Sequence, residues 1–378
     1  MVVEPQSNAA RENQAAFSLR QCRILEIADH SYFKLLLPDQ TTFYSVARRD
    51  GPADSQSTVL RRRVPLEEKK MTLLEFVRLV AALRRGDYDL VAVMPPPKPI
   101  WRSDRFWLTN LAHLLGTFIR KFRLCGIYAL RFVPANKLRL VMIDRHDEPT
   151  IRPGNFWLLA KCQLYFKREL PQNHWNIFLH ARSADVDMSH VRRQRFYQQA
   201  IRRLRPLPMP TFIEPDNFES EIPEKTHDLF YAGNLSNATL RDRGARCLEN
   251  LRHRGYRIDF LADKVGYHEY MERSRRAWLI WSPEGQGWQC RRHYEAIVLG
   301  SIPIINYPGI FQYKPLIHGE HCFYYGCEDD LMERTIIQAL ADKQRLRRMV
   351  RAAQDHLMKY FSREAMTSYI ESELRATI

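Results

Sequence analysis

Short apolar runs alternate with amphipathic segments along the first half of this 378-residue chain. Apolar runs bounded by polar residues or proline are expected to form buried strands. The strand candidates are residues 22–28, 32–37, 41–46, 88–94 and 138–143, with 158–166 as a strand or another buried segment. Apolar residues recur at helical spacing over 71–85, and a second helix is expected over 105–122. Helices that alternate with buried strands indicate an α/β fold with a parallel sheet.

A segment rich in proline and acidic residues, 206–224, interrupts this alternation, and we interpret it as containing an interdomain linker. The alternation then resumes. The expected strands are 227–232, 256–260, 277–281 and 302–305, and the expected helices are 239–254, 268–274, 329–340, 343–360 and 362–376. The predicted organisation is a disordered tail (1–16), an α/β domain (17–210), a linker (211–224), a second α/β domain (225–360) and a final helical segment (361–378).

The composition narrows the class of protein. A formal net charge of +15 predicts an acidic partner, which can be a phosphorylated substrate, a nucleic acid or an anionic membrane surface. The seven cysteines are scattered and odd in number, which favours reduced thiols in a cytosolic protein over a disulfide framework. The polar first 16 residues do not resemble a signal peptide, and no apolar run is long enough to predict a transmembrane helix.

The segment from 282 to 305 carries the clearest chemical signal. Gly285 and Gly287 lie in a loop, where they would let the backbone approach an anion at the start of the following helix. Arg291 and Arg292 fall in the first turns of that helix, where the helix dipole does not favour cations. We therefore interpret both arginines as facing an anionic ligand.

Glu295 shares roughly the same helix face and can accept hydrogen bonds from vicinal sugar hydroxyls. The alternative is a simple ion pair between Glu295 and one of the arginines on a solvated surface. The pattern as a whole consists of Ser-Pro-x-Gly-x-Gly from Ser282, Arg-x-x-Glu-Ala from Arg292 and Gly-Ser-Ile-Pro-Ile-Ile from Gly300. Over about 228–310 it resembles the donor-binding segment of GT-B glycosyltransferases, especially the exostosin-like and bacterial group-1-type enzymes.

This resemblance implies two Rossmann-like domains that face a cleft, with a C-terminal helix that crosses back to the first domain. It implies a nucleotide-sugar donor, with Glu295 on ribose or sugar hydroxyls and Arg291 or Arg292 on the diphosphate. Ser282, Gly285 and Gly287 are further donor-binding candidates in this segment. It also implies catalysis without a tightly bound metal or other cofactor. The acceptor would be a glycan or a lipid-linked molecule in bacterial surface polysaccharide synthesis, for example of lipopolysaccharide.

Another donor-side candidate is the loop that follows strand 227–232. Gly233, Asn234, Ser236 and Asn237 combine small and amide side chains with free backbone amides at a helix start, and these groups can contact a diphosphate. The alternative is that Ser236 or Asn237 only caps the helix.

Two charged clusters in the first half are expected to lie on the acceptor side of the cleft. A histidine beside carboxylates can act as an acid or base, and lysine or arginine can bind a phosphate or an acidic sugar. The candidates are Asp144, His146 and Asp147 in the first cluster and Lys167, Arg168 and Glu169 in the second. Both clusters can also be ordinary charged turns.

Other patterns support different functions less well. Asp185-Val-Asp187 matches a metal-binding Asp-x-Asp pair, and His318, His321, Cys322 and Cys327 are of zinc-ligand type, but neither set has a supporting pattern, so no metal site is predicted. The arginine-rich segment 190–205 would form a basic amphipathic helix, suited to an anionic membrane or simply solvated. We expect a cytoplasmic protein, with peripheral attachment to the inner membrane face as a further expectation. Nucleic-acid binding is disfavoured because no recognition motif is present. The alternatives are a basic nucleic-acid-binding protein and an inactive glycan-binding module.

Overall fold

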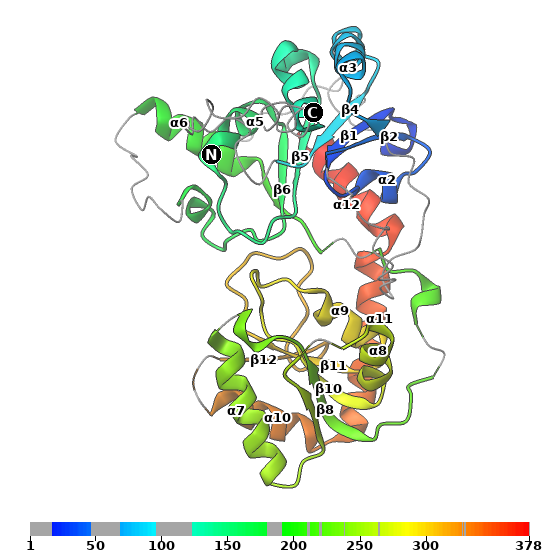
Figure 1. Cartoon of the computed structure of the whole chain (residues 1–378), viewed down its shortest axis with the longest axis vertical. Helices are drawn as coiled ribbons and strands as arrows, with labels where there is room; N and C mark the ends of the chain where they lie inside the picture. The colour runs from blue at the N-terminus through cyan, green and yellow to red at the C-terminus, as the bar shows by residue number, and fades with distance from the viewer. Residues whose placement is uncertain are drawn as a thin grey trace, which may run out of the picture.

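The computed structural model describes residues 17–46, 69–95, 123–179, 191–209, 212–218, 221–237, 239–263, 265–326, 328 and 330–377. These residues form two lobes, one above the other in Figure 1, and each lobe is built around one parallel sheet. The predicted tail (1–16), the predicted helix over 105–122 and the Asp185–Asp187 pair lie outside the described residues. The expectation of an α/β fold with two Rossmann-like sheets is confirmed.

The first lobe contains a seven-stranded sheet in the order β3-β2-β1-β4-β5-β6-β7. Its strands are β1 (Ile24–Ala28), β2 (Thr41–Ser45), β3 (Lys69–Lys70), β4 (Leu90–Val93), β5 (Leu140–Asp144), β6 (Leu164–Lys167) and β7 (Leu204–Pro206). Its helices are α2 (Phe33–Leu36), α3 (Leu73–Arg85), α5 (Phe156–Lys161) and α6 (Val191–Arg202). The strand order reverses direction between β1 and β4, and ligands of such sheets bind beyond the carboxyl ends of the strands.

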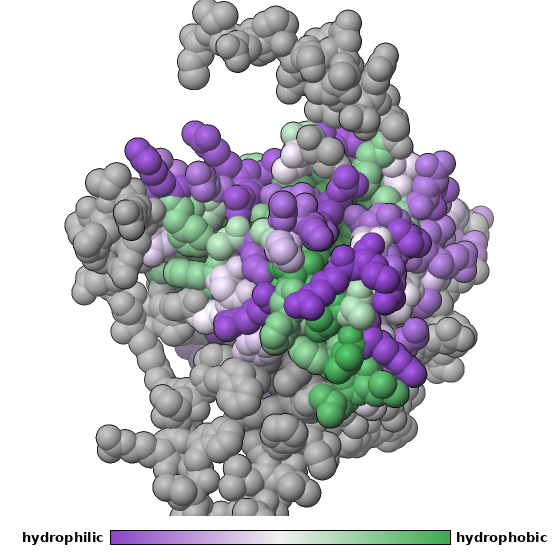
Figure 2. Space-filling model, turned by 90° about the horizontal axis from the view of Figure 1, so that it is seen from above, coloured by the Kyte–Doolittle hydropathy of each residue, from purple (hydrophilic) through white to green (hydrophobic). Residues whose placement is uncertain are grey.

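The predicted helix over 71–85 is α3, and its ends follow from local chemistry. The Thr72 side chain accepts a hydrogen bond from the backbone N–H of Glu75 and caps the first turn. Gly86 closes the helix with a φ of 77°, in the left-handed region that favours glycine. Leu73 and Leu74 near the start of α3 are exposed. Figure 2 shows the molecule from above, with hydrophobic side chains gathered among hydrophilic ones.

Several elements differ from the expectations. Residues 33–36 form helix α2 instead of a strand, because the Glu26 carboxylate accepts hydrogen bonds from the backbone N–H groups of Phe33 and Lys34 at the helix start. The segment 158–166 is divided between helix α5 and strand β6. The short edge strands β3, β7 and β12 (Phe323–Tyr325) were not predicted, and the expected helix over 190–205 ends at Arg202, before β7.

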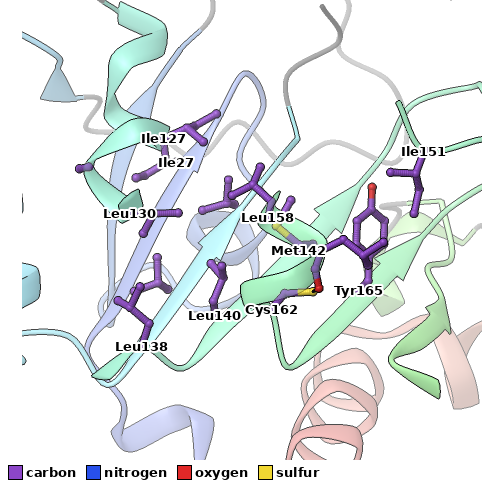
Figure 3. Close-up of a cluster of buried hydrophobic side chains, with 14 of the residues drawn as sticks. Ile27, Ile127, Leu130, Leu138, Leu140, Met142, Ile151, Leu158, Cys162 and Tyr165 are labelled. Carbon is purple, nitrogen blue, oxygen red and sulfur yellow. Dashed lines mark hydrogen bonds between the residues drawn. The ribbon is translucent and has the colours of Figure 1, made fainter. Parts of the chain in front are cut away.

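The core of the first lobe is shown in Figure 3. Leu140 and Met142 of β5 point to the face of the sheet where Leu158 and Cys162 from the α5 region pack. The alternate β5 residues Val141 and Ile143 belong to the cluster on the opposite face. Strand β5 is therefore buried on both faces, as its continuous apolar sequence indicates.

The second lobe contains a five-stranded parallel sheet in the order β12-β11-β10-β8-β9. Its other strands are β8 (His227–Ala232), β9 (Ile258–Leu261), β10 (Ala277–Trp281) and β11 (Ile302–Asn306). The helices are α7 (Thr239–His253), α8 (Tyr267–Arg275), α9 (Arg291–Val298), α10 (Leu331–Leu340) and α11 (Lys343–Phe361). Each of these strands and helices was expected within a few residues of its observed bounds, apart from β12.

The last helix, α12 (Arg363–Arg375), leaves the second lobe and packs on the first, as the crossover prediction requires (Figure 1). Ser362 separates α11 from α12 and caps the new helix by accepting a hydrogen bond from the Ala365 N–H. Met366 and Ile370 join the apolar cluster that includes Val141 and Ile143. No helix among the described residues is both long enough and apolar enough to cross a membrane.

Candidate functional site

The predicted site residues follow the carboxyl ends of four parallel strands. Strands β5 and β6 of the first lobe lead into residues 144–147 and 167–169. Strands β8 and β10 of the second lobe lead into the 233–237 and 282–290 loops. Helix α9 lies in the part of the second lobe next to the first lobe (Figure 1). The two lobes therefore bring donor-side and acceptor-side candidates toward one region.

Arg292 on α9 is held against strand β8. Its Nη2 atom donates a hydrogen bond of 3.0 Å to the Ala232 carbonyl, and its guanidinium carbon lies 4.8 Å from the centre of the Tyr231 ring. Its Nη1 atom is buried and has no hydrogen-bond partner. A Cβ atom at Gly233 would lie 2.9 Å from Arg292 Nη2, so this contact needs glycine. The arrangement leaves one buried N–H group of Arg292 ready for an acceptor atom.

Glu295 lies one turn further along α9 and is only 6% exposed. Its side chain makes no hydrogen bond or ion pair with the residues that the structure describes. Burial and the nearby Cys290 raise the pKa of Glu295 to about 7, against the opposing effect of Arg291 and Arg292. The alternative of a solvated Arg–Glu pair is therefore wrong. A role in binding the donor stays a prediction.

The side chains of Ser282 and Cys290 both contact His293 at the base of the 282–290 loop. Ser282 is fully buried, and its Oγ lies 2.7 Å from His293 Nδ1. The Cys290 Sγ lies 3.4 Å from the same Oγ. Burial alone would raise the pKa of Cys290, but His293 and Arg292 lower it to about 6. We correct our expectation for Ser282, since this side chain shapes the loop and does not face a ligand.

The 233–237 loop caps its own turn. Asn234 Oδ1 accepts hydrogen bonds from the N–H and the hydroxyl of Ser236, at 2.8 and 2.7 Å. The capping alternative thus describes the side chains of Asn234 and Ser236, and only the backbone of this loop remains suited to a diphosphate. The side chain of Asn237 lies outside the described residues.

Arg241 of α7 was not among the predicted site residues. It is 7% exposed, and it donates hydrogen bonds of 2.7 Å to the Asn234 carbonyl and 3.0 Å to the Glu284 carbonyl. It thereby joins the two loops at the carboxyl ends of β8 and β10, and Gly285 lies against it. The signal was present in the sequence, because Arg241 is a further arginine in a first helical turn, where the dipole disfavours cations.

Glu169 joins the two lobes. Its carboxylate is 2% exposed and accepts hydrogen bonds from the backbone N–H groups of Trp288 at 2.8 Å and Gln289 at 3.0 Å. In return, the Gln289 side-chain amide donates to the Arg168 carbonyl at 2.7 Å. A Cβ atom at Gly287 would lie 2.8 Å from the Glu169 carboxyl carbon. We correct two expectations: Glu169 does not face an acceptor, and Gly287 makes room for Glu169.

We predict that replacing Glu169 with alanine will loosen the 282–290 loop and lower kcat/KM about tenfold or more. Two buried backbone N–H groups would lose their acceptor, which costs on the order of 1–3 kcal/mol each. Urea denaturation and steady-state kinetics of the same variant measure the two effects. Replacement of the exposed Glu148, which also follows β5 in the first lobe, is the matched control. Wild-type stability in the Glu169 variant would contradict the role in joining the lobes.

Asp144 is part of a buried ion pair. Its Oδ2 accepts hydrogen bonds from Tyr165 at 2.7 Å and from the Lys167 Nζ at 2.9 Å, and Lys167 is fully buried. Although burial raises the pKa of Asp144, Lys167 and the other partners hold it below its ordinary value. Two expectations are corrected here: Asp144 is not a free base, and Lys167 cannot meet a phosphate.

His146 and Asp147 are the accessible members of this cluster. The Asp144 Oδ1 accepts a hydrogen bond from the His146 backbone N–H and holds the turn in place. The His146 Nε2 lies 2.8 Å from the carbonyl oxygen of Pro95. Because a carbonyl oxygen can only accept a hydrogen bond, Nε2 carries the proton. In the neutral ring, Nδ1 is then a hydrogen-bond acceptor. Asp147 pairs with Arg168, and the Asp147 side chain is 46% exposed. The structure thus leaves His146, Asp147 and Arg168 as candidates for the acceptor side.

Comparison with solved structures identifies the architecture. A glycosyltransferase from Rickettsia africae ESF-5 matches 94% of the chain and 98% of its own length, with a TM-score of 0.52 and 8% identity. An alpha-glucosyltransferase solved with UDP-glucose and DNA matches 93% and 99%, with a TM-score of 0.58 and 10% identity. The chain has the GT-B fold.

A third similar structure is Anabaena Alr3699/HepE in complex with UDP-glucose, which covers 93% of the chain and 99% of its own length. Its TM-score is 0.51 and its identity 15%. No protein-family model matches the sequence, and no curated protein matches it. The GT-B fold is therefore established, whereas the exostosin-like or group-1-type assignment stays an expectation. By the roles expected from the sequence, the first lobe is named the acceptor lobe and the second the donor lobe.

Proposed function

We propose that this protein transfers a sugar from a nucleotide-sugar donor to a glycan or lipid-linked acceptor. One observation carries the proposal: α9 presents an arginine with an unpartnered buried N–H group and, one turn away, a buried carboxylate with no partner among the described residues. A diphosphate and a pair of vicinal hydroxyls are the ligands that would satisfy both groups. The solved structures of similar fold that hold UDP or UDP-glucose support a uridine nucleotide as the donor.

The roles of the donor-lobe residues follow from their chemistry. An acceptor hydroxyl oxygen forms a bond to the anomeric carbon of the sugar while the bond from that carbon to the diphosphate oxygen breaks. Arg292 stabilises the negative charge that develops on the leaving diphosphate, with backbone N–H groups at the start of α9 and in the 233–237 loop as further donors. The Glu295 carboxylate accepts hydrogen bonds from donor hydroxyls. Arg241 holds the two loops at a fixed spacing.

On the acceptor side, His146 is the residue best placed to receive the acceptor proton, through its Nδ1 atom. We predict that His146→Ala will lower kcat at least a hundredfold while the donor dissociation constant changes less than threefold. Asp147→Asn should show the same split, with a smaller loss of kcat.

Asp144→Asn is the contrasting variant: it leaves Lys167 buried without its counter-ion, so the expected loss is about 3–5 kcal/mol of stability. Unchanged turnover in both the His146 and Asp147 variants would remove this acceptor-side assignment.

The function is tested by a thermal-shift panel of UDP, GDP, CMP and ADP with their sugar conjugates. A ligand that binds only the folded state raises its stability by RT ln(1 + [L]/Kd), about 2.7 kcal/mol at a hundredfold excess over Kd. We expect the midpoint to rise most with UDP and UDP-sugars and the rise to be lost in Arg292→Ala. Absence of a shift with every nucleotide would contradict the proposal.

A bacterial surface glycan or its lipid-linked precursor is the acceptor that the sequence resemblance supports, together with the net charge of +15. Peripheral attachment to an anionic membrane belongs to this proposal, since the acceptor would be presented there. Co-sedimentation with vesicles of phosphatidylglycerol and with neutral phosphatidylcholine vesicles tests the attachment. Equal binding to both kinds of vesicle, or to neither, would contradict it.

A second candidate acceptor is DNA. Two similar structures are of an alpha-glucosyltransferase in complex with DNA, and the net charge of this chain suits a polyanion. Binding through phosphates would weaken steeply between 50 and 200 mM salt. Transfer of radiolabelled sugar to duplex DNA, compared with transfer to a glycan extract, decides between the two acceptors.

A further inference from the structure

A groove of about 850 Å³ lies outside the predicted donor site, at the junction of both lobes. Its walls come from β7 of the acceptor lobe, from the loop 311–314 of the donor lobe, and from the end of α11 with the outward face of α12. Phe311 is at its edge, and the backbone N–H of Phe311 donates a hydrogen bond to the carbonyl of Leu170, the residue after Glu169. The groove thus begins beside the contact that joins the lobes.

The lining combines aromatic rings with cations. Phe311 is 48% exposed, and the rings of Tyr313 and Tyr369 contact each other with centroids 4.0 Å apart. Arg205 pairs with Glu373, the one carboxylate among the lining residues. Aromatic faces pack against the apolar C–H faces of sugar rings, and serine hydroxyls from α12 in the same wall can hydrogen-bond to sugar hydroxyls.

Two further cations of the groove have no counter-ion. The Lys314 and Lys359 ammonium groups lie 4.9 and 5.1 Å from the centre of the same ring, Tyr360. Neither lysine forms an ion pair with a carboxylate among the described residues. Lys314 also has a φ of 43°, a left-handed conformation that is uncommon for residues other than glycine. Two lysines beside the same ring, with no carboxylate paired to either, are suited to binding an anionic ligand.

We propose that this groove binds an acidic oligosaccharide, with a uronate carboxylate at Lys314 and Lys359 and a sugar ring against the exposed face of Phe311. The inference rests on the proposed function in one respect, because it names acidic glycan as the acceptor class. A nucleic acid fits the groove less well. The Tyr313 and Tyr369 rings already contact each other and leave no gap for a stacked base, so only Phe311 offers an open face.

The test uses the full chain without donor, so that its outcome is independent of transfer activity. Isothermal titration compares a tetrasaccharide of alternating glucuronic acid and N-acetylglucosamine with the same tetrasaccharide after reduction of its carboxyls to alcohols. We expect the acidic form to bind at least tenfold more tightly, and the double variant Lys314→Gln/Lys359→Gln to lose that preference. Lys137→Gln, at an exposed lysine of the acceptor lobe, is the matched control and should bind as the wild type does.

Phe311→Ala is the second test of the same groove, because it should weaken both tetrasaccharides without altering the preference for the acidic one. The UDP thermal shift of every variant shows separately whether the donor site is intact. Equal affinity for the acidic and reduced tetrasaccharides, or no measurable binding of either, would overturn the proposal. Displacement of the bound tetrasaccharide by single-stranded DNA of equal charge would also overturn it, in favour of a nucleic-acid groove.

Discussion

Replacing Arg292 with alanine should lower kcat by about 10²–10³, the effect measured when one donor to a developing negative charge is removed from an active site. The reason lies in the geometry of α9. Arg292 is anchored to the Ala232 carbonyl and to the Tyr231 ring, so its remaining buried N–H group is already oriented and needs no reorganisation. Steady-state kinetics with the donor selected by the thermal-shift panel measures the loss.

Arg291→Ala is the matched control for this prediction. Arg291 is the preceding residue of the same helix and has the same charge, but it is exposed. We expect its replacement to change kcat less than fivefold. Arg292→Lys should recover only a small part of the activity, because an ammonium group cannot keep the anchoring contact and the free N–H group at the same time. Equal losses in the Arg291 and Arg292 variants would mean that net charge matters and the fixed geometry does not.

Glu295→Gln should have opposite effects on function and on stability. Burial raises the pKa of Glu295 from an ordinary value of 4.5 to about 7, so the unliganded protein above pH 7 holds an ionised carboxylate in an unfavourable environment. The folded state binds more protons than the unfolded state between these two values, so this group makes stability fall as pH rises through that window. Above pH 7 the neutral amide should therefore stabilise the protein, by on the order of 2–3 kcal/mol.

The same substitution should raise the donor dissociation constant at least tenfold at pH 8, because an amide is a weaker acceptor for sugar hydroxyls than a carboxylate. Donor binding by the wild type should strengthen as pH rises through about 7, and Glu295→Gln should lose this dependence. Urea denaturation and titration with UDP-glucose at pH 6 and pH 8 measure both effects. Glu224→Gln, at an exposed carboxylate, should change neither. A destabilised Glu295→Gln protein with wild-type donor affinity would place Glu295 in the structural core instead.

Most elements of the donor lobe were predictable because their signals are local. Strand β10 is a continuous apolar run, and α9 begins where a glycine-bearing loop ends. Helix α2 was misread because its start is stabilised from a distance, by the Glu26 carboxylate on β1. Strand β12 has only three residues and pairs along one edge with β11, so too little sequence is available to define it.

The candidate site divides in the same way. Arg292 and Glu295 are three residues apart on one helix, so their common face was evident from spacing. The partners of Asp144, Lys167 and Glu169 could not be found by spacing, since a charged residue at a strand end has the same sequence whether it faces solvent or a buried partner. For that reason, two residues assigned to the acceptor proved to be a buried ion pair and another proved to join the lobes.

The order of elements, the parallel sheets and the predicted anion-binding role of α9 follow from apolar periodicity, helix dipoles and residue chemistry, all of which act between near neighbours in the chain. Only the tertiary structure determined which charged side chains have a hydrogen-bond or ion-pair partner. Burial removes water from every polar group at once, so each one must find a partner in the folded protein. Glu169 meets that requirement through the amides of Trp288 and Gln289. Glu295 and one N–H group of Arg292 are exceptions, since they have no partner among the described residues, and for that reason we assign them to a bound ligand.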